Sequence, residues 1–181
     1  MDNIFIKTFD TPQTYLNDEW LLRYDQLREK LPELVEVYEV NPHKIIMEKI
    51  DGDILETMRH TISPEMAYNI CSELYKCISL QLKVTDENIS FHSDMNLNNI
   101  VIQNGNIRII DPDSVTTIPL YEMSLDYFQV VFFQTSSLLA GSTRRARIDK
   151  LIKSRLNHMI KKSTVKQILG DDLYKEYFNE R

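Results

Sequence analysis

The chain contains little cysteine, glycine or proline. Its 181 residues include 2 Cys, 4 Gly and 6 Pro. So few glycines and prolines exclude collagen-like and linker-rich chains, and so few cysteines exclude a disulfide-stapled scaffold. Cys71 and Cys77 also lack the Cys-x-x-Cys spacing of redox and zinc motifs. We therefore expect reduced thiols and a cytoplasmic location.

Long hydrophobic runs and a signal peptide are also missing. Apolar runs extend over a handful of residues, too few for a membrane-spanning helix. Residues 1–4 have neither the basic start nor the apolar core of a secretion signal. With 43% hydrophobic and 27% charged residues, the composition is that of a globular domain that does not require a membrane.

Positive charge is scarce except in one segment. The formal net charge is −6, yet residues 141–166 contain nine Lys or Arg and one Asp. A basic segment on an acidic body can attract a phosphate-rich or RNA-bearing partner. Alternatively, it is a solvated helix face that offsets the acidic remainder.

Hydrophobic periodicity predicts a sheet-rich first part and a helical remainder. Alternation predicts strands over 4–9, 35–40 and 45–50, and helical spacing predicts a helix over 13–31. A further helix should run from an N-cap at Ser63 to about residue 84. Asn-Gly between two β-branched runs predicts a tight hairpin over 100–110. Later helices are expected over 121–140, 144–162 and 165–177, so the fold class is α+β.

A polar loop carries the chemistry. Residues 92–99 read His-Ser-Asp-Met-Asn-Leu-Asn-Asn, and an Asp-Pro-Asp segment begins at Asp111. Phosphoryl transfer needs a carboxylate near the attacking hydroxyl and oxygen ligands for Mg²⁺ near the phosphates. Asp94 and Asn99 stand at opposite ends of the loop, and the tight hairpin would return Asp111 beside them. Alternatively, these residues only form turns.

This pattern resembles the catalytic core of the protein-kinase-like superfamily. The kinase loop reads H-R-D-x-x-x-x-N, and the small-molecule phosphotransferase branch reads H-G-D-x-x-x-x-N. His92, Asp94 and Asn99 fall at the matching positions. The resemblance implies that ATP and Mg²⁺ are the cofactors, that Asp94 and Asn99 are catalytic, and that Asn99 and Asp111 ligate the metal.

The resemblance also implies a two-lobe fold. Residues 1–50 would form a truncated N-terminal sheet lobe, and 51–181 a mainly helical C-terminal lobe with the catalytic loop and basic terminal helices. Between them, Met47 would lie behind the adenine. The backbone carbonyl of Glu48 and the backbone amide of Ile50 would contact the adenine edge.

Further charged residues are assigned by the same resemblance. Asp53 would reach the ribose. Lys7 resembles the strand lysine that neutralises the phosphates, and Glu19 resembles the helix glutamate that holds this lysine. Asp126 would bond the catalytic-loop backbone from a buried helix, and His92 would pack under the loop.

Three departures from the family affect these expectations. The glycine-rich hairpin that covers the phosphates has no counterpart before Lys7. The metal motif reads Asp-Pro-Asp in place of Asp-Phe-Gly. Only 15 positions separate Asp111 from Asp126, too few for an activation segment. The layout is closer to aminoglycoside phosphotransferases and RIO-type atypical kinases.

The leading functional hypothesis is a minimal ATP- and Mg²⁺-dependent kinase that acts on Ser or Thr hydroxyls of a protein. A small-molecule phosphotransferase is one alternative. A second is a pseudokinase interaction module with weak or no nucleotide binding, favoured by the missing hairpin. A third is an ATPase-like factor that acts on an RNA-bearing partner through residues 141–166.

Overall fold

The computed structural model describes residues 3–82 and 87–123, together with Tyr127, Gln134 and Leu138. The helices of this part are α1 (Asp18–Lys30), α2 (Leu55–Met58) and α3 (Pro64–Gln81), with 3-10 turns η1 (Leu97–Asn99), η2 (Pro112–Ser114) and η3 (Leu120–Glu122). The strands are β1 (Ile4–Thr8), β2 (Val37–Asn41), β3 (Lys44–Glu48), β4 (Asp53–Ile54), β5 (Asn88–His92), β6 (Ile100–Gln103), β7 (Asn106–Ile109) and β8 (Val115–Pro119). The chain therefore mixes helices with small antiparallel sheets, as the α+β class predicts.

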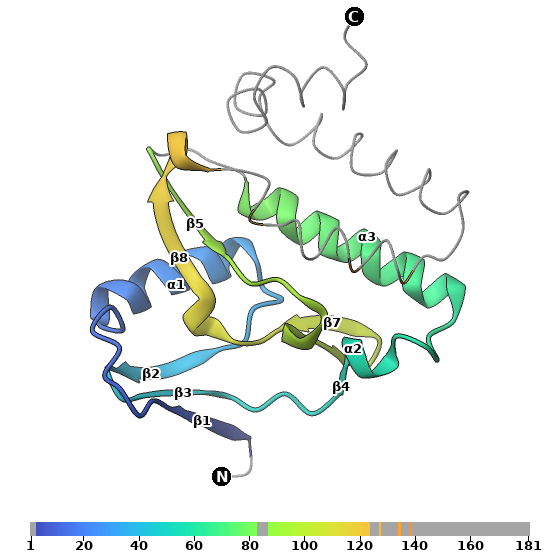
Figure 1. Ribbon diagram of the computed structural model, residues 1–181, viewed down its shortest axis with the longest axis horizontal. Helices are drawn as coiled ribbons and strands as arrows, with labels where there is room; N and C mark the ends of the chain where they lie inside the picture. Colours follow the sequence, from blue (N-terminus) through green and yellow to red (C-terminus); the bar gives the residue numbers. More distant parts are fainter. Residues whose placement is uncertain (1–2, 83–86, 124–126, 128–133, 135–137, 139–181) are drawn as a thin grey trace, which may run out of the picture.

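The first sheet has the order β1-β3-β2, with β3 at its centre (Figure 1). Helix α1 buries three aromatic and aliphatic side chains, Trp20, Tyr24 and Leu27, at the spacing of one helical face. The helix starts later than residue 13 because the side chain of Asn17 accepts a hydrogen bond from the Trp20 amide (3.0 Å) and caps it. The predicted strands and helix of this region are otherwise confirmed.

Strand β1 lies at the edge of this sheet. It pairs with β3 alone, and its apolar residues Ile4, Phe5 and Ile6 are 47%, 52% and 54% exposed. Their exposure is unusual for an apolar strand, because such side chains are normally covered by a neighbouring element. Among the described residues, β1 is therefore an edge strand with one strand partner.

The predicted hairpin is confirmed as β6 and β7. Asn104 (φ 52°) and Gly105 (φ 81°) both have left-handed backbone, which a type I′ turn requires. Strand β4 adds to this pair and gives the sheet order β4-β6-β7.

The expectation that only helices follow the hairpin is wrong. Strand β8 follows it and lies beside β5 (Figure 1). The two strands pair antiparallel, and Val115 lies opposite His92. The hydroxyls of Ser90 and Thr117 bond across this pair at 2.7 Å. Polar strands of this kind show little hydrophobic periodicity, and their partners are distant in sequence.

Helix α3 confirms its predicted start. The hydroxyl of Ser63 accepts from the Met66 amide (3.2 Å), and Pro64 occupies the first turn. Neither cysteine forms a disulfide, both are buried on this helix, and burial raises the pKa of Cys71 to about 12. Within the ranges described above, no helix has the length and apolarity to cross a bilayer.

The helices predicted after residue 120 lie largely outside the described residues. The 3-10 turn η3 stands where the helix over 121–140 was expected to begin. Most of that helix, the helices over 144–162 and 165–177, and the basic segment 141–166 lie outside the described residues. The boundary between lobes at residues 50 and 51 stays a prediction.

We expect the two described loop glycines to respond differently to alanine. A Cβ at Gly52 would lie 2.4 Å from the Ile102 carbonyl oxygen and 2.7 Å from a Val101 methyl carbon. The cost of overpacking backbone is about 2–3 kcal/mol. Gly105 has open space, but its left-handed φ makes Gly105→Ala cost about 1 kcal/mol. Urea unfolding measures both, and an equal or smaller loss at Gly52 would contradict the packing account.

Candidate functional site

The catalytic-loop candidate follows β5, and hydrogen bonds of its own polar side chains stabilise its conformation. The Asp94 carboxylate accepts from the Asn96 amide (2.8 Å) through one oxygen and from the Asn99 amide (3.0 Å) through the other. Asn99 also donates to the Asp94 carbonyl (2.9 Å). The carboxylate is exposed, so it is held in one orientation yet remains open to solvent.

Backbone bonds bring the Asp111 segment beside this loop. The Ile110 amide donates to the Asn99 carbonyl at 2.9 Å. The amide and hydroxyl of Ser93 both donate to the Ser114 carbonyl, at 2.9 and 2.7 Å. The β6–β7 hairpin thus returns Asp111 next to the loop that begins before Asp94 and ends at Asn99.

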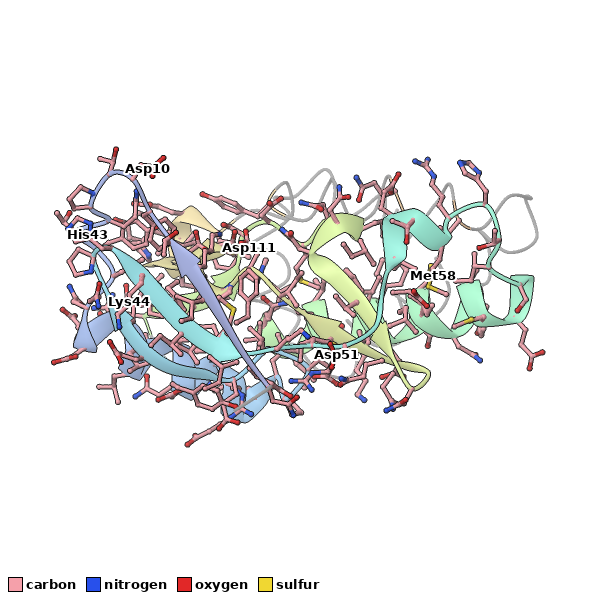
Figure 2. All side chains as sticks on the ribbon, turned by 90° about the horizontal axis from the view of Figure 1, so that it is seen from below. Asp10, His43, Lys44, Asp51, Met58 and Asp111 are labelled. Carbon is pink, nitrogen blue, oxygen red and sulfur yellow. The ribbon has the colours of Figure 1, made fainter. Side chains whose placement is uncertain are left out.

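Asp111 sits in a strained turn. Its φ of 68° and ψ of 57° are left-handed, a conformation that Asp tolerates better than most residues and that concentrates at functional sites. The Ser114 hydroxyl donates to one carboxylate oxygen (3.0 Å), and the Lys7 ammonium binds the other. Figure 2 shows Asp111 beside strand β1, between the first sheet and the hairpin.

The expected pair between Lys7 and Glu19 is wrong. The Lys7 ammonium contacts the carboxylates of Asp111 and, at 2.6 Å, Asp113. The Glu19 side chain is 69% exposed and pairs with Arg23, four residues along α1. Glu19 and Asp113 both line a cavity of about 460 Å³ between α1 and β8. Arg23 lies one turn further along the same face of α1, so Glu19 forms its ion pair with Arg23.

The three charged groups shift one another's protonation. Although partial burial acts to lower it, the two carboxylates raise the pKa of Lys7. Partial burial acts to raise the pKa of Asp111, but the Lys7 ammonium holds it below its usual value. Burial and the neighbouring Asp111 charge raise the pKa of Asp113 in spite of Lys7. One ammonium therefore neutralises only part of the negative charge of the two carboxylates.

The hinge candidates occupy the end of β3 and the segment after it. Met47 is buried, and it pairs across the sheet with Phe5 of β1. The Glu48 carboxylate binds Arg108 of β7 through both oxygens, at 2.5 and 3.2 Å. Ile50 is half-buried, and Asp53 is exposed on β4.

Two glutamines that the sequence did not single out hold the loop backbone. The Gln81 side chain, buried at the end of α3, accepts from the His92 amide (2.7 Å). The Gln134 side chain accepts from the Leu97 amide (2.8 Å). Asp126, which was expected to bond this loop, lies outside the described residues. A glutamine in an apolar helix was the available signal, since a buried amide requires partners.

His92 is fully buried under the loop, as expected. Its Nε2 lies 2.9 Å from the Ile110 carbonyl, so this nitrogen carries the proton in the neutral ring. Its Nδ1 has no hydrogen-bond partner among the described residues. Burial lowers the pKa of His92, because the charged ring would be poorly solvated.

The His92 environment predicts a loss of stability in mild acid. The pKa of His92 lies below its ordinary value of 6.5 when folded, so the unfolded chain binds the proton first. The free energy of unfolding therefore contains the full contribution of His92 above pH 6.5. It decreases as the pH drops below 6.5, by at most about 1.4 kcal/mol per pH unit. Denaturant unfolding of the wild type and His92→Gln between pH 5 and 7 measures the difference. Equal slopes for the two proteins would refute the assignment.

Comparison with known proteins gives a likeness in fold. No protein-family model matches the chain, and no curated protein matches it. The kinase PK-1 of Cydia pomonella granulovirus has a solved structure that aligns with 98% of this chain and 87% of its own, with a TM-score of 0.53 and 12% identity. The fold is therefore similar to that of a viral kinase. At this identity the likeness concerns the fold alone.

Proposed function

We propose that this protein is a minimal ATP- and Mg²⁺-dependent phosphotransferase, and that its acceptor is a Ser or Thr hydroxyl of a protein. One observation carries the proposal. Asp94 and Asn99 share a loop, Asp111 is bonded beside that loop, and Lys7 reaches Asp111 from the first sheet. These four residues are of the types that phosphoryl transfer requires.

The donor set fits Mg²⁺. Asp111 offers a half-buried carboxylate, and the Asn99 amide oxygen remains when its nitrogen donates to Asp94. Among the described residues, no group of three or more His, Cys, Asp and Glu forms a closed metal cage. Mg²⁺ itself uses one or two protein carboxylates and completes its shell with phosphate and water oxygens. When bound, the ion would neutralise phosphate charge.

The chain's own residues would divide the remaining work. Asp94, held by two side-chain amides and open to solvent, would orient the acceptor hydroxyl and accept its proton. Lys7 would neutralise phosphate oxygens. Met47, the Glu48 carbonyl and the Ile50 amide would contact the adenine, and Asp53 would reach the ribose.

The acceptor side is less constrained. A protein hydroxyl is the acceptor that we propose, and a small-molecule acceptor is the alternative. We also propose that the basic segment 141–166 attracts a phosphate-rich or RNA-bearing partner, because its charge is opposite to that of the remaining chain. Two buried cysteines that form no disulfide support a reducing, cytoplasmic location.

A second candidate function is favoured by the edge position of β1. A covering hairpin would supply backbone donors to the phosphates and exclude water. Within the described part of the chain, strand β1 pairs with β3 alone. The described sheet therefore contains no covering hairpin that would supply backbone donors to the phosphates. The second candidate is accordingly a pseudokinase interaction module with weak or no nucleotide binding.

Transfer of label from γ-labelled ATP tests the first function. With Mg²⁺ present, the wild type should label itself or a generic protein acceptor. Asp94→Ala and Asp111→Ala should each reduce labelling by about 100-fold, because they remove the proton acceptor and a metal ligand. Removal of Mg²⁺ with EDTA should abolish labelling.

Thermal unfolding separates the two candidates and controls for folding. Both variants should keep a cooperative transition, and Mg·ATP at millimolar concentration should raise the Tm of the wild type. Equal labelling by all three proteins would overturn the assignment of the site. No rise in Tm together with no labelling would instead support the pseudokinase.

A further inference from the structure

We propose that Asp113 is the residue that positions Lys7 for the nucleotide phosphates, in the place where a glutamate of α1 was expected. The inference rests on the proposed function and assigns a role within the same site. It makes Asp113 a positioning residue, since it acts through the lysine and contacts no reacting atom.

The first argument is contact. The Asp113 carboxylate lies 2.6 Å from the Lys7 ammonium, and its side chain is only 15% exposed. The turn of η2 fixes this geometry, because the Ser114 amide donates to the Asp111 carbonyl at 3.1 Å and Pro112 restricts the backbone between the two aspartates.

The second argument is the lack of a competitor. Glu19, on α1, is engaged by Arg23 and directs most of its surface to solvent. The described ion pairs of Lys7 involve only Asp111 and Asp113. Both of its partners therefore belong to η2 and its N-cap residue, directly before β8.

The third argument comes from the proposed metal site. A carboxylate that ligates Mg²⁺ directs its charge to the ion, so Asp111 would bind Lys7 less strongly once the ion is present. Asp113 would then hold the ammonium by itself. A lysine side chain has high rotamer entropy, so a fixed carboxylate beside it keeps the ammonium in place for the phosphates.

A competing reading makes the opposite prediction. If Asp113 only repelled the triphosphate or sequestered Lys7 away from it, its neutralisation would tighten Mg·ATP binding. If Asp113 positions Lys7, the same change weakens binding, and the effect requires Lys7 to be present. The sign of the change and its dependence on Lys7 therefore decide between them.

The experiment is Mg·ATP titration by calorimetry on the full chain. Asp113→Asn should weaken binding about tenfold, Asp113→Glu less than Asp113→Asn, and Glu19→Gln less than twofold. In the Lys7→Met background, Asp113→Asn should change the affinity less than twofold, because its target is gone. Tighter binding by Asp113→Asn, or an equal loss with and without Lys7, would overturn the inference.

A double-mutant cycle on thermal stability without nucleotide keeps the pairing separate from the proposed function. Lys7→Met and Asp113→Asn should be non-additive in Tm, whereas Lys7→Met and Glu19→Gln should be additive. Coupling in a protein that neither binds nor transfers from ATP would overturn the proposed function, and with it the positioning role, but not the ion pair. Additivity between Lys7 and Asp113 would overturn the inference even in an active protein.

Discussion

The ion pairs of Lys7 are the interaction on which the candidate site depends. One ammonium from the first sheet meets two carboxylates from the turn before β8. Two carboxylates so close together would repel each other, and partial burial would make their charge more costly. The lysine offsets both effects and joins two segments that are about a hundred residues apart in sequence. The site therefore forms only when the first sheet and the hairpin region come together.

Other contacts between these segments support that arrangement. The Val35 amide donates to the Ile109 carbonyl (3.0 Å), and the Ile109 amide donates to the Glu33 carbonyl (2.8 Å). Arg108 then binds Glu48 at the end of β3. These bonds attach strand β7 to the segment before β2 and to the end of β3. The first sheet is therefore attached to the hairpin region by these bonds in addition to the ion pairs of Lys7.

The sequence predicted those features whose cause is local. The left-handed Asn104-Gly105 turn and the Ser63 cap are encoded by adjacent residues, and both are present. The partner of Lys7 was predicted wrongly, because a carboxylate on α1 and one before β8 are equally plausible until the chain folds. Gln81 and Gln134 contact the 92–99 loop from distant positions, so their apolar sequence surroundings could indicate a buried amide but not its partner.

The edge of β1 has a consequence for association. The Lys49 amide donates to the Asn3 carbonyl, and the Phe9 amide donates to the His43 carbonyl, so the bonded groups of residues 3 and 9 face the β3 side. Along an antiparallel strand, residues that bond to the partner strand alternate with residues that do not. The peptide groups of residues 4, 6 and 8 consequently point away from β3, among apolar side chains. An extended polypeptide with matching spacing can hydrogen-bond there and enlarge the sheet by one strand. Within the part of the chain that the structure describes, no further strand pairs with this edge, so the segment that carries Lys7 meets the requirements of a template for intermolecular β-pairing.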